Sequence, residues 1–147
     1  MKIITHISLA ITALIVIGNA SHGNTFNKRG CTVFFDEIRW QYRLLLVNID
    51  DHQELYELKE YLDYSATELS SRRLLVIGVD KKVVQLSNNS LSCLPSLSET
   101  QKRLHKNKAI LIGLDGGIKQ QYDAVDAVRI FSDIDAMPIR RRERKGN

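Results

Sequence analysis

The sequence RLLLVNIDDH, at residues 43–52, decides the fold because it describes a buried strand that runs directly into a helix. Residues 44–47 form an unbroken apolar run, which is typical of a strand covered on both faces in an α/β sheet. Residues 48–52 then supply the turn and the helix cap. In open α/β sheets, ligands and catalytic groups gather beyond the carboxyl ends of the central strands, so this is where chemistry is expected.

Asp50, Asp51 and His52 are the candidate binding residues at this strand end. Two carboxylates and an imidazole can hold a divalent cation or act as an acid and a base. Adjacent residues point in different directions, however, and Asp51 with Glu54 fits a capping box at a helix start. The sequence has no second group of His, Cys or Asp at metal-ligand spacing. A structural role is therefore favoured, and no metal or cofactor is predicted.

The first twenty residues have the layout of a secretory signal peptide. Met1 and Lys2 give a positive start, residues 7–17 an apolar core, and residues 18–20 a small-residue cleavage site. An uncleaved membrane anchor is the alternative, but the apolar stretch is shorter than the roughly 20 residues that span a bilayer. We therefore predict export to a periplasm or to the exterior, cleavage near Ala20, and a flexible leader over residues 21–30.

The apolar pattern beyond this leader predicts one α/β domain over residues 31–139, with helices on both faces of a mixed central sheet. Residues 81–96 favour turns. Besides the strand at 43–47, the expected elements are a short edge strand at 33–35, a helix at 51–71, a parallel strand at 74–79, a short helix capped by Ser96 or Ser98, a hairpin of strands at 109–114 and 118–122, and a helix from about 123 that stops at Pro138.

Cys31 and Cys93 are the two cysteines of the chain. An even cysteine count in an exported protein favours a disulfide. A bridge that closes a loop of about sixty residues stabilises a fold by roughly 4 kcal/mol in the chain-entropy model. The alternative is a reactive thiol at Cys93, on a loop, with Cys31 as the resolving thiol. The sequence leaves both open.

The net charge of +4 is concentrated at the C-terminus. Residues 140–147 carry +4 by themselves, so the rest of the mature domain is close to neutral. A uniformly basic face for specific nucleic-acid binding is therefore not indicated. We interpret these residues as a solvated tail, with weak contact to a polyanion or a membrane surface as the alternative. Its basic residues are Arg140, Arg141, Arg142, Arg144 and Lys145.

The order strand, helix, strand, helix, hairpin, helix is that of a thioredoxin-like core. Three motifs sharpen the match: IRW-x-x-RLLLV at 38–47, LIG-x-DGG-x-K at 111–119, and IDAMP-x-R-x-R at 134–142. Over residues 35–144 the chain resembles the domain-of-unknown-function family 4174. The resemblance implies a peroxiredoxin-like fold, in a family that occurs in exported bacterial proteins and in secreted, sushi-repeat-containing animal proteins. It implies no reaction.

Thioredoxin-type enzymes place Cys-x-x-Cys, and peroxiredoxins a single cysteine, where the first core strand meets its helix. In this chain residues 48–53 read NIDDHQ and contain no thiol. Those enzymes also carry a cis-proline before the third core strand, where this chain has Asn107-Lys108. We therefore expect a binding or structural module that engages an unknown protein partner with its sheet end or its first long helix. The alternative is a thiol-dependent oxidoreductase or peroxide-handling protein that acts through Cys93 with Cys31.

Overall fold

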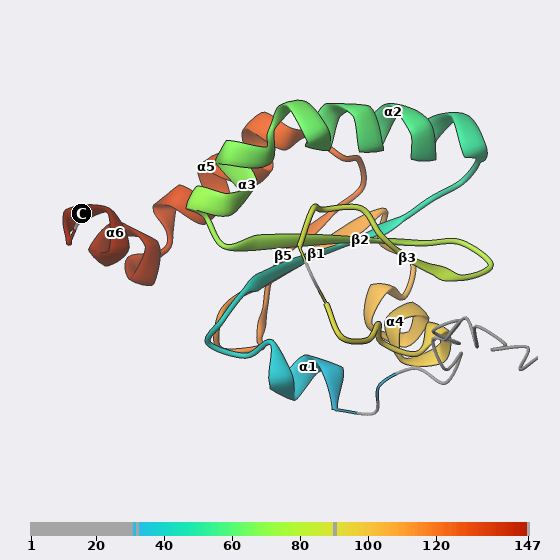
Figure 1. The fold of residues 1–147 in the computed structure, drawn as a ribbon, viewed down its shortest axis with the longest axis horizontal. Helices are drawn as coiled ribbons and strands as arrows, with labels where there is room; N and C mark the ends of the chain where they lie inside the picture. The colour runs from blue at the N-terminus through green and yellow to red at the C-terminus, as the bar shows by residue number, and fades with distance from the viewer. Residues whose placement is uncertain (1–30, 32, 90, 147) are drawn as a thin grey trace, which may run out of the picture.

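The computed structural model describes residue 31, residues 33–89 and residues 91–146, which form a five-stranded mixed sheet with helices on both faces (Figure 1). The strand order is β3-β2-β1-β4-β5. The predicted signal peptide, residues 1–20, and the predicted leader, residues 21–30, lie outside the described residues. The predicted domain, residues 31–139, is described except for residues 32 and 90.

The central strand of the sheet is β1 (Arg43–Asn48). It pairs in parallel with β2 (Leu74–Val79) and antiparallel with β4 (Ala109–Ile112). β4 in turn pairs antiparallel with β5 (Ile118–Tyr122), and in the loop between them Gly116 has a φ of 81°, a left-handed conformation that favours glycine. The predicted parallel pair and the predicted hairpin are both confirmed.

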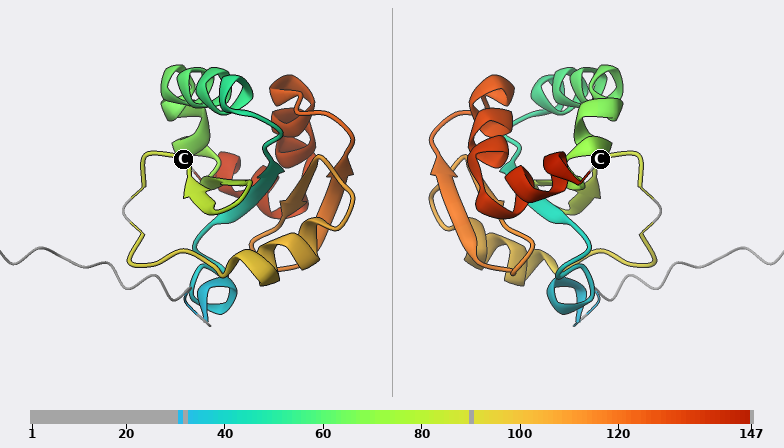
Figure 2. Two further views of the ribbon diagram at one scale, coloured as in Figure 1. Left: turned by 90° about the vertical axis from the view of Figure 1, so that its right-hand side faces the viewer. Right: turned by 90° about the vertical axis from the view of Figure 1, so that its left-hand side faces the viewer.

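Alternate side chains of β1 face opposite layers, which explains its unbroken apolar run. Leu45 and Val47 pack in the layer that holds α2 (His52–Tyr64), α3 (Ala66–Ser71) and α5 (Ala127–Ala136). Leu44 and Leu46 pack in the layer that holds α1 (Phe34–Glu37) and α4 (Leu97–Leu104). The side views in Figure 2 show the sheet between these two layers. The predicted single thioredoxin-like α/β domain is confirmed.

Two predicted elements near the N-terminus of the domain are wrong. The edge strand expected at residues 33–35 is part of helix α1, which buries Phe34 against the sheet. The single helix expected at 51–71 is divided at Ser65 into α2 and α3. Leu62 on α2 and Leu69 on α3 both pack in the same buried cluster, so the apolar stripe predicted across the two segments is kept.

Three further elements differ in their extent. Within the turn-rich residues 81–96, β3 (Val83–Gln85) adds an antiparallel edge strand to β2. α5 starts after Asp126, which caps it by accepting the N–H of Arg129 at 3.1 Å, and not at residue 123. α5 ends at Ala136, before Pro138 as predicted, but Pro138 then begins a further helix, α6 (Pro138–Lys145), because the first helical position needs no N–H. The expected solvated tail is therefore helical as far as Lys145.

Helix α6 has no buried residue and is held to the domain by charged contacts. Glu143 pairs with Arg43 at 3.2 Å, with Arg140 at 3.7 Å, and also with Arg73. Arg140 extends this network to Asp135 on α5, at 3.2 Å. The inward face of α6 is therefore a polar contact made by two of its residues, Arg140 and Glu143.

The Arg43 side chain is only 1% exposed, although it carries a charge. Its guanidinium donates to the carbonyl of Arg72 at 2.7 Å and to Glu143 at 3.2 Å. Burial lowers the pKa of Arg43, and Glu143 opposes this effect. Partial burial also acts to raise the pKa of Glu143, but the hydrogen bond from Arg73 and the charge of Arg43 outweigh it, so this pKa lies below its usual range. Glu143 therefore compensates a charge that water cannot reach.

Replacing Glu143 with glutamine is expected to lower the free energy of unfolding by about 2–3 kcal/mol at neutral pH, because Arg43 then remains buried without its counter-charge. The pKa of Glu143 is lower in the folded than in the unfolded state. Its contribution is thus complete above the unfolded pKa and is lost as the pH falls through the folded pKa. Urea unfolding of the native and variant proteins, at neutral pH and in acid, measures both effects.

The matched control is Glu60→Gln, because Glu60 is an exposed carboxylate on α2 for which the described residues offer no ion pair. It is expected to change the free energy of unfolding by less than about 0.5 kcal/mol. Equal losses in the two variants would contradict the proposed role of Glu143. So would a loss in Glu143→Gln that persists in acid.

Candidate functional site

The carboxyl end of β1 is occupied by a salt-bridged cluster. Asp51 caps α2, since its carboxylate accepts the N–H of Glu54 at 2.9 Å. Lys108 pairs with Asp50 at 2.8 Å and with Glu54 at 2.6 Å. His52 is exposed on the first turn of α2. The three candidates predicted from the sequence are therefore engaged in different ways, and the structure adds Lys108 to the group.

Lys108 is the residue at this end that sequence reasoning missed. It lies directly before β4, where its carbonyl accepts the N–H of Asn48 at 2.8 Å, and its side chain is 17% exposed. Burial acts to lower the pKa of Lys108, but the hydrogen bonds to Asp50 and Glu54 outweigh this and raise it above the usual range. The lysine is thus a permanent cation that neutralises carboxylates at the place where thioredoxin-type enzymes keep their thiol.

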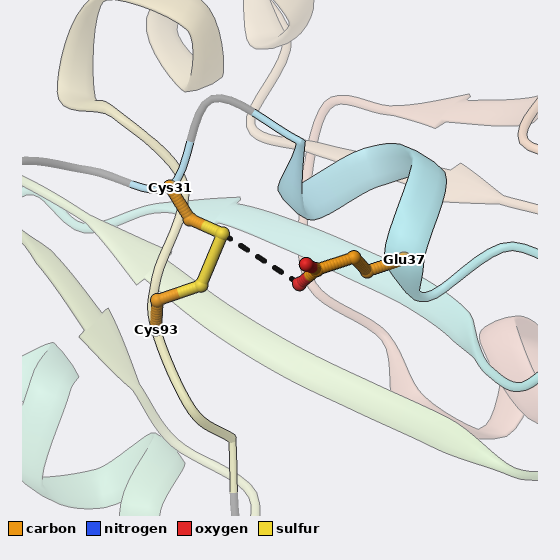
Figure 3. A group of neighbouring side chains, drawn as sticks. All are labelled: Cys31, Glu37 and Cys93. Carbon is orange, nitrogen blue, oxygen red and sulfur yellow. Dashed lines mark hydrogen bonds between the residues drawn. A yellow bond between two sulfur atoms is a disulfide. The ribbon is translucent and has the colours of Figure 1, made fainter.

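Cys31 and Cys93 form a disulfide, so the predicted pairing is confirmed (Figure 3). Their Cα atoms are 5.7 Å apart across a sequence separation of 62 residues. Beside the bridge, the N–H of Cys31 donates to the carbonyl of Leu94 at 2.9 Å. Cys31 packs in the layer of α1 and α4 and not at the turn between β1 and α2. The bridge therefore fastens the start of the described domain to the loop before α4.

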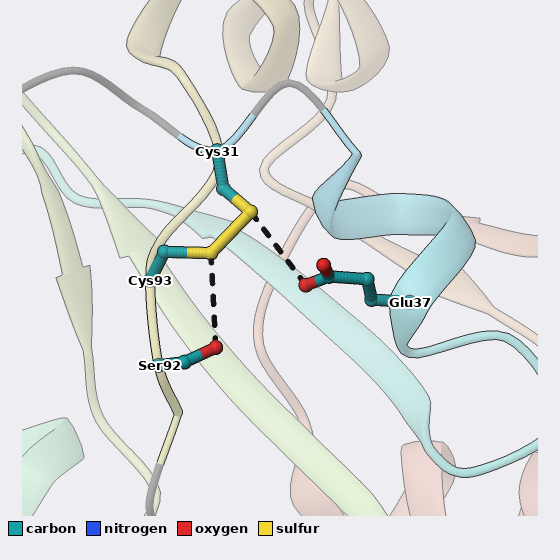
Figure 4. The surroundings of a disulfide bond; sticks show 4 residues. All are labelled: Cys31, Glu37, Ser92 and Cys93. Atoms are coloured by element: carbon teal, nitrogen blue, oxygen red, sulfur yellow. Dashed lines mark hydrogen bonds between the residues drawn. A yellow bond between two sulfur atoms is a disulfide. The ribbon is translucent and has the colours of Figure 1, made fainter.

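The carboxylate of Glu37, on α1, lies beside this disulfide (Figures 3 and 4). Its Oε2 atom is 3.6 Å from the Sγ atom of Cys31, and the Ser92 hydroxyl is 4.0 Å from the sulfur of Cys93. A bridged sulfur carries no proton, so the approach of Glu37 is a close contact and not donation from a thiol. Cys31, Glu37 and Cys93 have the spacing of a metal-ligand set. The metal ligand that cysteine supplies is a thiolate, which a disulfide does not provide.

A recess of about 200 Å³ lies between α2, α3, α5 and the sheet. Figure 2 shows α2 and α5 side by side on the same face of the sheet. The buried residues of its lining are Leu45, Leu62, Leu69, Leu74, Val76 and Ile130. The more exposed residues, which form its rim, are Leu58, Tyr61, Val125, Ala127 and Phe131. Tyr61 is the one lining residue with a polar side-chain atom.

The recess opens to solvent and is lined almost entirely by apolar side chains. Removing such a lining from water is favourable, and a bound apolar group would do this. The recess is therefore the strongest candidate for a binding site in the described residues.

The basic residues predicted as a tail differ in their contacts on α6. Arg140 turns inward to Asp135 and Glu143. The described residues offer no ion pair to the others, which are exposed: Arg141, Arg142, Arg144 and Lys145. A helix therefore presents four cations to solvent where the sequence predicted a chain without regular structure. None of the described helices is long and apolar enough to cross a membrane.

Among the comparisons with known proteins, a family model matches this chain. No match was found among curated proteins or among solved structures. The family model that matches residues 34–143 is described as "Domain of unknown function (DUF4174)". This range contains every strand of the sheet, the Lys108 cluster and the recess, and it starts after Cys31. The chain therefore belongs to the family DUF4174, as its motifs predicted.

Proposed function

We propose that this chain is an exported binding module without thiol catalysis, which engages its partner on the face formed by α2 and α5. The observation that carries the proposal is the apolar recess of about 200 Å³ between these helices. Next to it, α2 exposes Tyr61 and Tyr64, which are 44% and 83% exposed and lie three residues apart on one helix face. Half-exposed tyrosines beside an apolar hollow are typical of binding surfaces.

The cysteine bridge supports the exported location. Disulfides form and persist in oxidising compartments such as the periplasm or the exterior, and are rare in reducing ones. The described domain contains one, between Cys31 and Cys93. The signal peptide predicted over residues 1–20 adds the route by which such a protein would reach that compartment.

The surroundings of the cysteines argue against the alternative, an oxidoreductase or peroxide-handling protein that acts through Cys93 with Cys31. A reactive thiol needs a lowered pKa, which cations and helix N-termini provide. The group beside this bridge is instead the Glu37 carboxylate, whose oxygen lies within 4.8 Å of both sulfurs. A nearby carboxylate disfavours a second negative charge, and so it opposes formation of a thiolate after reduction. The reduced cysteines are therefore expected to be slow nucleophiles.

Alkylation of the purified full-length protein, followed by mass measurement, tests this proposal. Neither cysteine is expected to react with iodoacetamide until the protein is reduced, and the thiols of the reduced protein are expected to react slowly near neutral pH. Glu37→Gln is expected to raise their rate by about threefold to tenfold, because it removes the nearby negative charge.

The control is Asp36→Asn, which removes the neighbouring exposed carboxylate that pairs with Arg39 and not with a cysteine. It is expected to leave the alkylation rate unchanged. Fast alkylation of Cys93 below neutral pH, or alkylation before reduction, would overturn the non-catalytic assignment in favour of thiol chemistry.

A second contact is supported by α6, which carries four exposed cations and is tied to the domain by Arg140 and Glu143. A rigid cationic helix attracts anionic surfaces through an interaction that salt screens. We propose this helix as a weak attachment surface for a polyanion or an acidic membrane.

Retention on immobilised heparin, and on vesicles rich in phosphatidylglycerol, measures this attachment as a function of salt. Changing all four exposed cations of α6 to glutamine is expected to abolish the salt-dependent retention. The matched control changes Lys81, Lys82, Lys102 and Lys106, four exposed lysines elsewhere, and is expected to retain it. Equal retention by both variants would assign the salt-dependent binding to net charge and would contradict the proposed role of α6.

A further inference from the structure

We propose that the recess between α2 and α5 is a binding site for an uncharged apolar group, a single ring or a short alkyl chain, carried by a small molecule. This inference rests on the proposed binding function and names the chemistry of its ligand. Ten of the eleven side chains in the lining are aliphatic or phenyl groups, and the eleventh is Tyr61. Burial of apolar surface is therefore the main interaction that the recess offers.

The volume fits this class of ligand. An engineered apolar cavity of about 150 Å³ lined by Leu, Ile and Phe stays dry and binds benzene or xenon. The recess here measures about 200 Å³ and has a lining of the same kind. Unlike that cavity the recess opens to solvent, so a ligand would displace water that lies against an apolar lining. Tyr61 is at the rim, so no polar side chain lines the interior of the recess.

The cation that stacks on a lining residue of the recess is already neutralised. Arg72 stacks over the ring of Phe131, with its guanidinium carbon 4.7 Å from the ring centroid. Its nitrogens pair with Asp135 at 2.6 Å and with Glu68. Arg72 thus joins α3 to α5 at one end of the recess and leaves no unpaired charge there to receive a carboxylate.

The elements that form the rim carry an excess of negative charge. α2 exposes Glu57, Glu60 and Asp63 against one cation, Lys59. The loop before α5 exposes Asp123 and Asp126. These carboxylates repel an anionic ligand at the mouth. The site is therefore expected to accept benzene or benzylamine and to reject benzoate. By the same reasoning, it is expected to reject the carboxylate end of a fatty acid.

Titration of the full chain with benzene, followed by chemical-shift changes and by the melting temperature, tests the proposal. Ala127→Leu fills the recess from α5 and is expected to weaken benzene binding by at least about tenfold, because one methylene in an apolar pocket already matters on that scale. Val125→Phe fills it from the preceding loop, in case the first variant folds poorly. The control is Ala136→Leu, the same substitution on the same helix at an exposed position outside the lining.

We expect benzene to bind saturably to the native protein and to Ala136→Leu. We expect the two filled variants to lose this binding. Benzylamine is expected to bind at least as well as benzene, and benzoate is expected not to bind. No saturable binding by the native protein would overturn the proposal and reduce the recess to a packing defect. Equal affinity in the filled variants would place the site elsewhere. Both results are independent of the cysteine alkylation rate, so they leave the non-catalytic assignment standing.

Discussion

The structure depends on covering β1 on both faces. Its side chains alternate between two apolar clusters, so each cluster needs a layer of helices to exclude water from a continuous run of leucine and valine. The two layers solve this problem differently. α1 and α4 are short, and the Cys31–Cys93 bridge joins the segment before α1 to the loop before α4. α2, α3 and α5 are held to the sheet without closing completely over it, and the recess is the space that remains.

The polar ends of β1 are neutralised by separate clusters of charge. At its carboxyl end, Lys108 forms ion pairs with Asp50 and Glu54 beside the place where a thioredoxin-type enzyme holds its thiol. At its amino end, Arg43 is buried and compensated by Glu143, which ties the last helix to the central strand. At the carboxyl end His52 is exposed, while the carboxylates beside it serve as a helix cap or as partners of Lys108. The apolar recess lies instead on a helical face, between α2 and α5.

Local patterns are sufficient to predict the centre of the fold. The unbroken run at 44–47, the cap at Asp51, the cap at Ser96 and the Asp-Gly-Gly turn are each short-range signals, and the structure contains all of them. The cysteine count and the predicted compartment favoured the Cys31–Cys93 pairing without excluding a reactive Cys93, and the structure contains the bridge. These features depend on a few neighbouring residues or on composition, and so they can be read from one sequence.

The features that sequence reasoning missed depend on distant contacts. The break at Ser65 has no local signal in the apolar stripe, which continues from Leu62 to Leu69, and α1 places Phe34 in a buried cluster formed by distant residues. The ion pairs of Lys108 span more than fifty residues, and Glu143 lies 100 residues from Arg43. Pro138 is typical of a helix stop, whereas the structure uses it as a helix start. The recess itself results from the separation of two helices, which no local pattern encodes.

The function that we propose for this domain is located in the recess between α2 and α5. Intermolecular nuclear Overhauser effects between bound benzene and the protein's methyl groups test this location most directly, because they report contacts of a few ångströms. We predict contacts to Leu58, Leu69 and Val76, which line the recess, and none to Leu46, Ile77 or Leu104 in the opposite layer. Contacts to the opposite layer, or the absence of contacts to either, would contradict it.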